Sequence, residues 1–228
     1  MKTSSVFKPV CLMALVILAL AQFACSYATQ LIGESLQKSG TSQPASCVNK
    51  YLPANAGATR TLAGSGYTEI ITIPSLRKAN FEEKWIEGPT GGKQTTNYYL
   101  WDCTNAGLVL SGVNSRMFLA NKGVTVPVSI KAGDHWTQSY QELISTITTN
   151  YVAVGEESIT LPAGTFTAMK IQINSVAHAN TGNKNPDLKE EGFEWWAEGI
   201  GTIKTAITYI GTTTTPQVVR ELQSYSNP

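Results

Sequence analysis

The sequence predicts an all-β fold, and three observations support this prediction. Apolar and polar residues alternate with a period of two from Tyr67 to the C-terminus, as in strands that bury one face. Glycine, proline and asparagine interrupt the alternation about every ten residues, which is the spacing of antiparallel hairpins. After the N-terminal segment no long stretch has helical periodicity, although residues 139–149 allow a short turn.

Turn residues separate the alternating segments into twelve predicted strands. Pro162 stands where a turn needs a φ of about −65°, and Gly164 follows at the exit into the next strand. Gly199 and Gly201 permit the positive φ or the bulge that folds one strand back on its neighbour. The predicted strands are 67–73, 79–86, 94–102, 107–113, 124–130, 134–142, 145–154, 156–161, 165–176, 192–198, 201–210 and 217–225.

The N-terminus predicts export. Residues 1–9 carry Lys2 and Lys8 and no acid, and an unbroken apolar run follows from Val10 to Ala21. This pattern is typical of a secretion signal, and the run is too short to cross a bilayer core of about 30 Å as a stable helix. The next segment is polar and contains glycine, serine and proline, as in a flexible tether. We therefore expect a signal peptide at 1–25, a tether at 26–46 and one β domain at 47–228.

The processing site is ambiguous between two outcomes. Ala24-Cys25-Ser26 resembles the lipobox of a bacterial lipoprotein, although Gln22 and Phe23 depart from that motif. Lipidation of Cys25 would anchor the chain to a membrane, whereas cleavage near Ala28 would release it. The slightly favoured outcome is a lipoprotein of the periplasm, outer membrane or cell surface, and the alternative is a secreted soluble protein.

Cysteine usage predicts one disulfide. Cys11 leaves with the signal and Cys25 is either lipidated or removed, so Cys47 and Cys103 remain as a pair in an oxidising compartment. The alternative is two buried thiols. Two thiols and two scattered histidines do not predict a metal site, so we expect no metal.

Composition argues against several classes of function. About 200 mature residues can form one domain with a large core. Charged residues make up 14% of the chain, and loss of Lys2 and Lys8 changes the formal net charge from +1 to −1. Without a basic patch or an acidic run, nucleic acid and strongly charged substrates are poor candidates as partners. The Gly-x-Gly at 199–201 is a turn within strand alternation, so no cofactor is expected.

The order of turn signals contains a weak internal repeat. Ile71-Thr72-Ile73-Pro74 parallels Ile159-Thr160-Leu161-Pro162, and an aromatic strand and a glycine follow in both halves. Two degenerate copies folded into one sheet would produce this order. The alternative is that β-proteins reuse the same turn residues by chance.

A reactive constellation is not apparent in the sequence. His135 and His178 have no activated nucleophile beside them, and both are interpreted as strand-edge or turn residues. Glu194 and Glu198 alternate with aromatic residues, as in sugar-binding or glycan-cleaving sites. Alternation places Glu194, Trp196 and Glu198 on one face and Trp195 on the other. The simpler interpretation is a solvated carboxylate face.

Aromatic residues are the best candidates for a ligand surface. The chain has five tryptophans and nine tyrosines, more than a minimal core requires. Some of them would line a concave surface that binds a lipid or a partner, with Trp136, Trp195 and Trp196 as the candidates. The alternative is that they only fill the core.

Three sequence motifs carry a resemblance to a known family. GEESITLPAGTFTAMKI, EWWAEGIGTIK and ELQSYS resemble a loose family of exported bacterial β-rich proteins, many of them lipoproteins of unknown function. The likeness covers residues 155–225 well and the upstream half loosely, and the lipobox departs from it. The resemblance implies a long antiparallel sheet, strongly curled into a half-barrel-like meander around a hydrophobic concavity, similar to lipoprotein carriers.

We therefore expect a non-enzymatic, exported envelope protein that binds an apolar ligand such as a lipid, or another envelope protein. Contact with a membrane is expected only through Cys25. One alternative is an envelope glycan hydrolase that uses Glu194 or Glu198 as acid and base. Another is a structural or adhesive module that pairs through its strand edges.

Overall fold

The computed structural model describes residues 47, 49–52, 54–179, 187–211 and 213–227. The chain divides into two units, Met1–Gln43 and Pro44–Pro228. The predicted signal peptide, the predicted tether and Cys25 lie outside the described residues. Every regular element that the structure describes is a β-strand. In these residues no helix has the length and apolar character that crossing a membrane requires.

The described residues form fourteen strands, which agrees with the predicted all-β fold although twelve strands were predicted. They are β1 (Thr59–Gly64), β2 (Tyr67–Thr72), β3 (Asn80–Pro89), β4 (Thr95–Thr104), β5 (Gly107–Val113), β6 (Arg116–Met117), β7 (Ala120–Lys122), β8 (Val126–Pro127), β9 (His135–Gln141), β10 (Ser145–Leu161), β11 (Gly164–Ala179), β12 (Leu188–Ala197), β13 (Gly201–Ile210) and β14 (Val218–Ser226).

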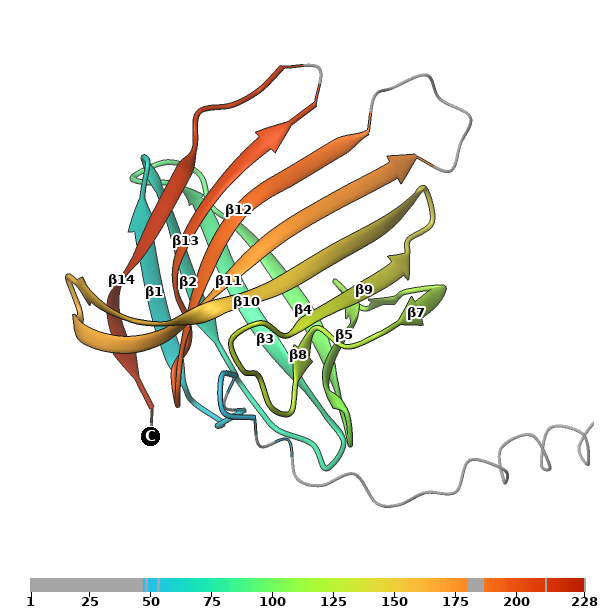
Figure 1. Cartoon of the computed structure of the whole chain (residues 1–228), viewed down its shortest axis with the longest axis horizontal. Helices are drawn as coiled ribbons and strands as arrows, with labels where there is room; N and C mark the ends of the chain where they lie inside the picture. Colours follow the sequence, from blue (N-terminus) through green and yellow to red (C-terminus); the bar gives the residue numbers. More distant parts are fainter. Residues whose placement is uncertain (1–46, 48, 53, 180–186, 212, 228) are drawn as a thin grey trace, which may run out of the picture. The chain divides into compact units, whose positions relative to one another are not determined.

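These strands make one antiparallel sheet that curls around an interior (Figure 1). The order is β6-β5-β4-β3-β2-β1-β14-β13-β12-β11-β10-β9-β7, and β8 pairs with β5. The first strand therefore lies beside the last, and consecutive hairpins extend from this pair in both directions. This arrangement confirms the predicted long, curled antiparallel sheet.

The two ends of the sheet approach each other without forming a ladder between β5 and β9. The short segment 116–127 bridges them, because β6 pairs with β5 and β7 pairs with β9. Side-chain amides add to the bridge: Asn121 and Gln138 both donate to the carbonyl of Leu110. The sheet is thus open in its pairing, and its two edge strands are the short, exposed β6 and β7.

The strand predictions were wrong in several details, and β1, β6 and β7 were not predicted. β1 was missed because Arg60, one of its two buried residues, is charged and interrupts the apolar alternation around Leu62. The predicted strands 145–154 and 156–161 are one strand, β10, with a register shift between Ala153 and Gly155. The predicted strand 124–130 shortens to the two residues of β8.

The segment before β1 closes one end of the interior. Tyr51 and Leu52 are buried, and their backbone amides both donate to the side-chain oxygen of Asn49. A disulfide joins Cys47 to Cys103, with Cα atoms 5.2 Å apart, so the bridge expected from the cysteine count is present in the structure. Because the bridge ties this segment to the end of β4, it holds the floor of the interior in place.

The far end of the β10–β11 hairpin packs against another part of the sheet. The backbone amide of Ala163 donates to the carbonyl of Leu222 in β14, and the rings of Phe166 and Tyr225 meet edge to face. In Figure 1 this hairpin end extends past β14. Leu161 of the hairpin belongs to a hydrophobic cluster with residues of β1, β2 and β12–β14.

Candidate binding cavity

The strand register brings chemically active side chains to the inner face of the sheet. Ile171 of β11 faces Glu194 of β12, and Glu194 in turn faces Thr205 of β13. Directly paired residues of an antiparallel sheet share a face. Because Ile171 and Thr205 are buried, Glu194 points inward with them.

The interior contains a cavity of about 240 Å³. Strands from both halves of the sheet contribute to its wall, and Tyr51 and Leu52 line it from the closing segment. The lining combines three kinds of side chain, namely aromatic rings, aliphatic groups and polar or charged groups. The aromatic residues are Tyr51, Trp85, Trp101, Tyr140, Tyr151 and Trp196, and the charged residues are Arg60, Glu83, Glu190 and Glu194.

A buried ion pair joins a residue of β1 to a residue of β3 on the inner face of the sheet. Arg60 Nη2 lies 2.8 Å from Glu83 Oε1, and both side chains are almost fully buried. Glu83 Oε2 accepts hydrogen bonds from the indole N–H groups of Trp85 and Trp101, at 3.2 and 3.1 Å. Gly201 leaves room for this guanidinium, since a Cβ there would lie 3.3 Å from Arg60 Cζ. Glu83 is therefore fully partnered.

Glu194 has a different environment on the opposite wall. Trp196 Nε1 donates to Glu194 Oε2 at 2.6 Å. The carboxylate touches the cavity and is otherwise enclosed by protein. Burial raises the pKa of Glu194 to about 7, and this indole N–H opposes the rise. The expected solvated carboxylate face was wrong for this residue, because the sheet curls toward the face that carries Glu194.

Glu190 lies four residues earlier on the same face of β12. Burial raises its pKa above the ordinary value. Among the described residues it has no hydrogen-bond or ion-pair partner, in contrast to Glu83. Its paired neighbours are Ser175 of β11 and Tyr209 of β13. Burial, together with the charge of Glu190, raises the pKa of Tyr209 to about 12.

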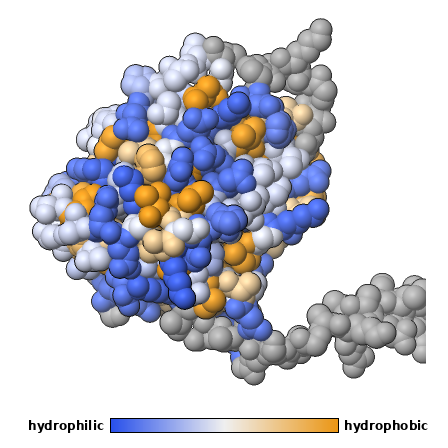
Figure 2. Space-filling view, viewed as in Figure 1, coloured by the Kyte–Doolittle hydropathy of each residue, from blue (hydrophilic) through white to orange (hydrophobic). Residues whose placement is uncertain are grey.

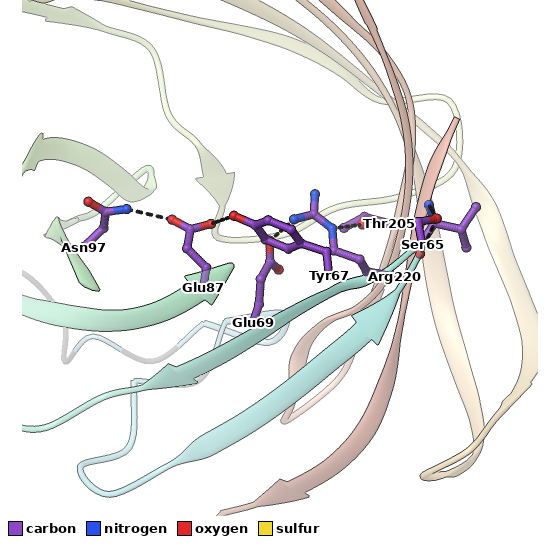
Figure 3. A network of polar contacts seen from close by, with 8 residues as sticks. Ser65, Tyr67, Glu69, Glu87, Asn97, Thr205 and Arg220 are labelled. Carbon is purple, nitrogen blue, oxygen red and sulfur yellow. Dashed lines mark hydrogen bonds and ion pairs between the residues drawn. The ribbon is translucent and has the colours of Figure 1, made fainter. Parts of the chain in front are cut away.

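A second polar network occupies the inner face of β2, β3, β4, β13 and β14 (Figure 3). Glu87 accepts hydrogen bonds from Asn97 at 2.7 Å and from the hydroxyl of Tyr67 at 3.4 Å. Arg220 forms an ion pair with the buried Glu69. Its guanidinium also lies over the ring of Tyr67, 5.5 Å from the centroid. The interior is consequently polar as well as aromatic.

The outer face of β12 carries Trp195, and lysines cover it. Lys170 and Lys204 place their ammonium groups 5.1 and 5.3 Å from the Trp195 ring centroids. The indole N–H donates to Glu157 of the β10–β11 hairpin. In the view of Figure 2, hydrophobic residues occur in separate groups among hydrophilic ones. Trp195 is therefore buried at an outer packing site and does not line the cavity, contrary to the expectation from sequence.

The other two candidate tryptophans lie close together inside. Trp136 stacks on Tyr151 at 5.1 Å, and Trp196 contacts both rings at 6.2 and 6.5 Å. Trp196 lines the cavity, while Trp136 packs behind it in the core and donates to the carbonyl of Thr125. Aromatic residues thus both fill the core and line the cavity.

The remaining sequence candidates lie elsewhere. Glu198 lies beyond the end of β12, exposed, with its carboxylate 3.5 Å from Lys50. His135 is exposed at the start of β9, and His178 pairs with Asp187 at 2.8 Å near the ends of β11 and β12. Within the described part of the chain no group of three or more His, Cys, Asp or Glu could hold a metal ion.

Two other hollows are less suited to binding. The larger, of about 510 Å³, lies at the β9–β10 turn and is lined by exposed apolar residues such as Met117, Leu119 and Leu143. Another, of about 250 Å³, is lined by residues such as Arg77 and Asp102. Neither has buried, unpartnered polar groups that converge on it, so the interior cavity is the candidate site.

Comparisons with known proteins agree with this architecture. A family model described as DUF3108-like matches residues 135–207. A predicted lipoprotein from Parabacteroides distasonis has a similar structure, with a TM-score of 0.52, 14% identity, and coverage of 78% of this chain and 99% of that chain. A predicted exported protein with a YmcC-like fold from Bacteroides fragilis gives a TM-score of 0.52, 13% identity, and coverage of 78% and 100%. No curated protein matched. At these identities the likeness establishes the fold alone.

Sequence reasoning missed most of the charged residues of the cavity. Arg60 and Glu83 form an ion pair between two different strands, and no spacing in the sequence indicates that they meet. Glu190 lies before residue 192, where the sequence predicted its strand to start. The available signal was the alternation of Glu190, Gly192 and Glu194 with the aromatic residues of β12. That alternation assigns them to one face, but it does not say which face the sheet encloses.

Proposed function

We propose that this chain is an exported, non-catalytic protein of the bacterial cell envelope that holds a small ligand inside its curled sheet. The observation that carries the proposal is the interior cavity, because aromatic rings and a few convergent polar groups are the usual lining of a small-molecule site. The closing segment and its disulfide hold the cavity floor, so the site is largely formed before a ligand arrives.

Two observations support an exported location. The disulfide between Cys47 and Cys103 is a bond that persists in oxidising compartments. The solved structures with the same fold are described as a predicted lipoprotein and a predicted exported protein. The basic and apolar N-terminal segment is consistent with both. Lipidation at Cys25 and release near Ala28 remain alternative forms of the same proposal.

The lining favours an amphipathic ligand over a purely apolar one. Rings such as Trp101, Tyr151 and Trp196 would contact an apolar body, whereas Glu190 and Glu194 need polar groups opposite them. A lipid remains a candidate ligand if it presents such a group. A second envelope protein is less favoured, because the convergent groups lie inside the sheet.

The geometry does not favour the two alternative functions. Glu194 points into the cavity while Glu198 lies in an exposed turn beside Lys50, so the two do not flank one cleft as a glycosidase pair would. Strand-edge pairing is disfavoured because the two edge strands are very short, with two residues in β6 and three in β7.

Native mass spectrometry of the protein purified from its host tests the proposal, with expected co-purification of a small molecule. Binding of the neutral fluorescent probe N-phenyl-1-naphthylamine gives a second readout. Ser175 lines the cavity, so Ser175→Phe should fill it and abolish probe binding. The control is Asn174→Phe, on the opposite face of β11, which should leave binding intact. Folded protein that carries no small molecule and binds no probe would contradict the proposal.

A further inference from the structure

The inner face of the sheet carries an excess of negative charge. Five glutamates point inward from described strands, against two arginines, which is a formal excess of three negative charges. Each arginine already pairs with one glutamate, Arg60 with Glu83 and Arg220 with Glu69. The three glutamates without a cationic partner in the described residues are Glu87, Glu190 and Glu194.

Two of these three carboxylates line the cavity with acceptor capacity left over. Glu194 receives one hydrogen bond, from Trp196, and Glu190 receives none from the described residues. A carboxylate enclosed in protein without a cation is costly, so an occupant that brings positive charge lowers the free energy of the whole site. The same wall does not supply that charge, because both inward guanidiniums are already paired.

Arg60 belongs to the wall of this cavity, but its free donor does not face an occupant. The side chain is 7% exposed, and its Nε, which has no hydrogen-bond partner in the described part of the chain, has almost no accessible surface. A ligand in the cavity therefore does not reach this N–H, and Nη2 of the same guanidinium is held by Glu83. Among the described residues Arg60 forms no ion pair with Glu190 or Glu194, so it does not replace a cation at those carboxylates.

The aromatic rings of the cavity also favour a positively charged ligand. Trp85, Trp101, Tyr140, Tyr151 and Trp196 line the cavity. The faces of such rings attract ammonium groups, most strongly where the contact excludes water. The protein already uses this contact outside, where Lys170 and Lys204 lie over Trp195. Inside, the described residues bring aromatic rings and carboxylates together without a lysine.

We propose that the ligand of this cavity is an organic ammonium ion with an apolar body, whose cationic group binds at Glu190 and Glu194. This inference rests on the proposed binding function and narrows its ligand class. The ammonium group donates to the two carboxylates, and the aromatic rings enclose the apolar body.

Three probes of equal length test the charge preference: octylamine, 1-octanol and octanoate. Each is titrated against N-phenyl-1-naphthylamine bound to the exported protein at pH 8. The dissociation constant of octylamine, obtained from displacement of the probe, should be at least about tenfold lower than that of 1-octanol, as expected for one charge-assisted hydrogen bond. Octanoate should compete most weakly. In the double variant Glu190→Gln plus Glu194→Gln, octylamine should lose its advantage over 1-octanol, so that the two dissociation constants measured on that variant are equal.

A matched control removes two carboxylates outside the cavity. Glu157→Gln plus Glu198→Gln changes the net charge equally and should preserve the preference for octylamine. Equal displacement by all three probes, or a preference for octanoate, would overturn the ammonium proposal and leave the binding function standing. Failure of N-phenyl-1-naphthylamine itself to bind folded protein would instead remove the proposed function. Circular dichroism of each variant establishes that it is folded.

Discussion

Trp195 and Trp196 are consecutive residues on β12, yet they occupy opposite environments. Each indole N–H donates to a glutamate, Trp195 to Glu157 and Trp196 to Glu194. Around Trp195 the glutamate is exposed and two lysines lie over the ring. Around Trp196 the glutamate is enclosed, its pKa is raised to about 7, and it lines a cavity.

This difference shows how the same pair of residue types serves two purposes. On the outer face the aromatic ring, the carboxylate and the lysines satisfy one another, so the site is complete and contributes to packing. On the inner face the aromatic rings and carboxylates are present without a lysine in the described residues. The curl of the sheet therefore separates an outer packing site from the inner cavity for which we propose a cationic ligand.

The largest expected effect comes from removing the disulfide that fixes the segment closing one end of the interior. Replacing both Cys47 and Cys103 with serine should lower the free energy of unfolding by about 4 kcal/mol, because the bridge closes a long loop. Chemical denaturation measures this loss. Binding of N-phenyl-1-naphthylamine should weaken as well, since Leu52 of the closing segment lines the cavity. A double variant with unchanged stability would contradict the structural role of the bridge.

The next effect is a pH dependence specific to the inner face. The pKa of Glu194 is about 7 in the folded protein and 4.5 as the ordinary value. The protonated form is therefore favoured in the fold, and its stabilising contribution is complete below about pH 4.5 and lost as pH rises through about 7. The groups that surround this carboxylate are Glu190, Arg60 and the indole of Trp196.

Glu194→Gln removes this titration. The free energy of unfolding of the wild type minus that of the variant should fall by up to about 3 kcal/mol between pH 4.5 and pH 8. Denaturation curves of both proteins across this range provide the measurement, and the subtraction cancels the carboxylates they share. A difference that stays constant with pH would show that Glu194 is not held in its protonated form by burial.

A direct comparison of the two tryptophans gives an intermediate effect. Trp196→Phe leaves the enclosed Glu194 without its indole donor, whereas Trp195→Phe leaves an exposed Glu157 that water can hydrate. We expect the first substitution to cost about 2 kcal/mol more than the second, the penalty for a buried group left unsatisfied. Equal losses in denaturant unfolding would mean that the two environments are equivalent.

The smallest expected effect belongs to the outer face. Lys170→Met keeps the aliphatic length of the side chain but removes the charge over Trp195 and Phe193. A partly exposed cation–π contact contributes about 0.5–1 kcal/mol, so the loss should lie in that range and decrease with added salt. A loss above about 2 kcal/mol would mean that Lys170 has a structural role beyond this contact.

Much of the fold was predictable because it depends on local alternation and turn residues. The hairpin turn at Pro162 and Gly164 and the turn at Gly199–Gly201 were found from residue types alone. β1 was not found, because an inward arginine breaks the apolar alternation on which the prediction depends. Its partner, Glu83, lies two strands away, and no spacing in the sequence connects them.

The candidate site was predictable only in part for a related reason. Alternation correctly separated Trp195 from Trp196, but it could not tell which face of β12 the sheet encloses. That choice depends on the curl of the whole sheet and on how β1 meets β14. The solvated-face interpretation of Glu194 was reasonable for an isolated strand, and the curl overturned it.

The central claim is that Glu194 faces a cation when the cavity is occupied. Carbon-13 NMR titration of the glutamate carboxyls, with and without saturating octylamine, measures this directly. We predict that the pKa of Glu194, about 7 in the free protein, falls when octylamine is bound and does not fall with 1-octanol. A pKa of Glu194 that octylamine leaves unchanged, while it occupies the cavity, would contradict the account.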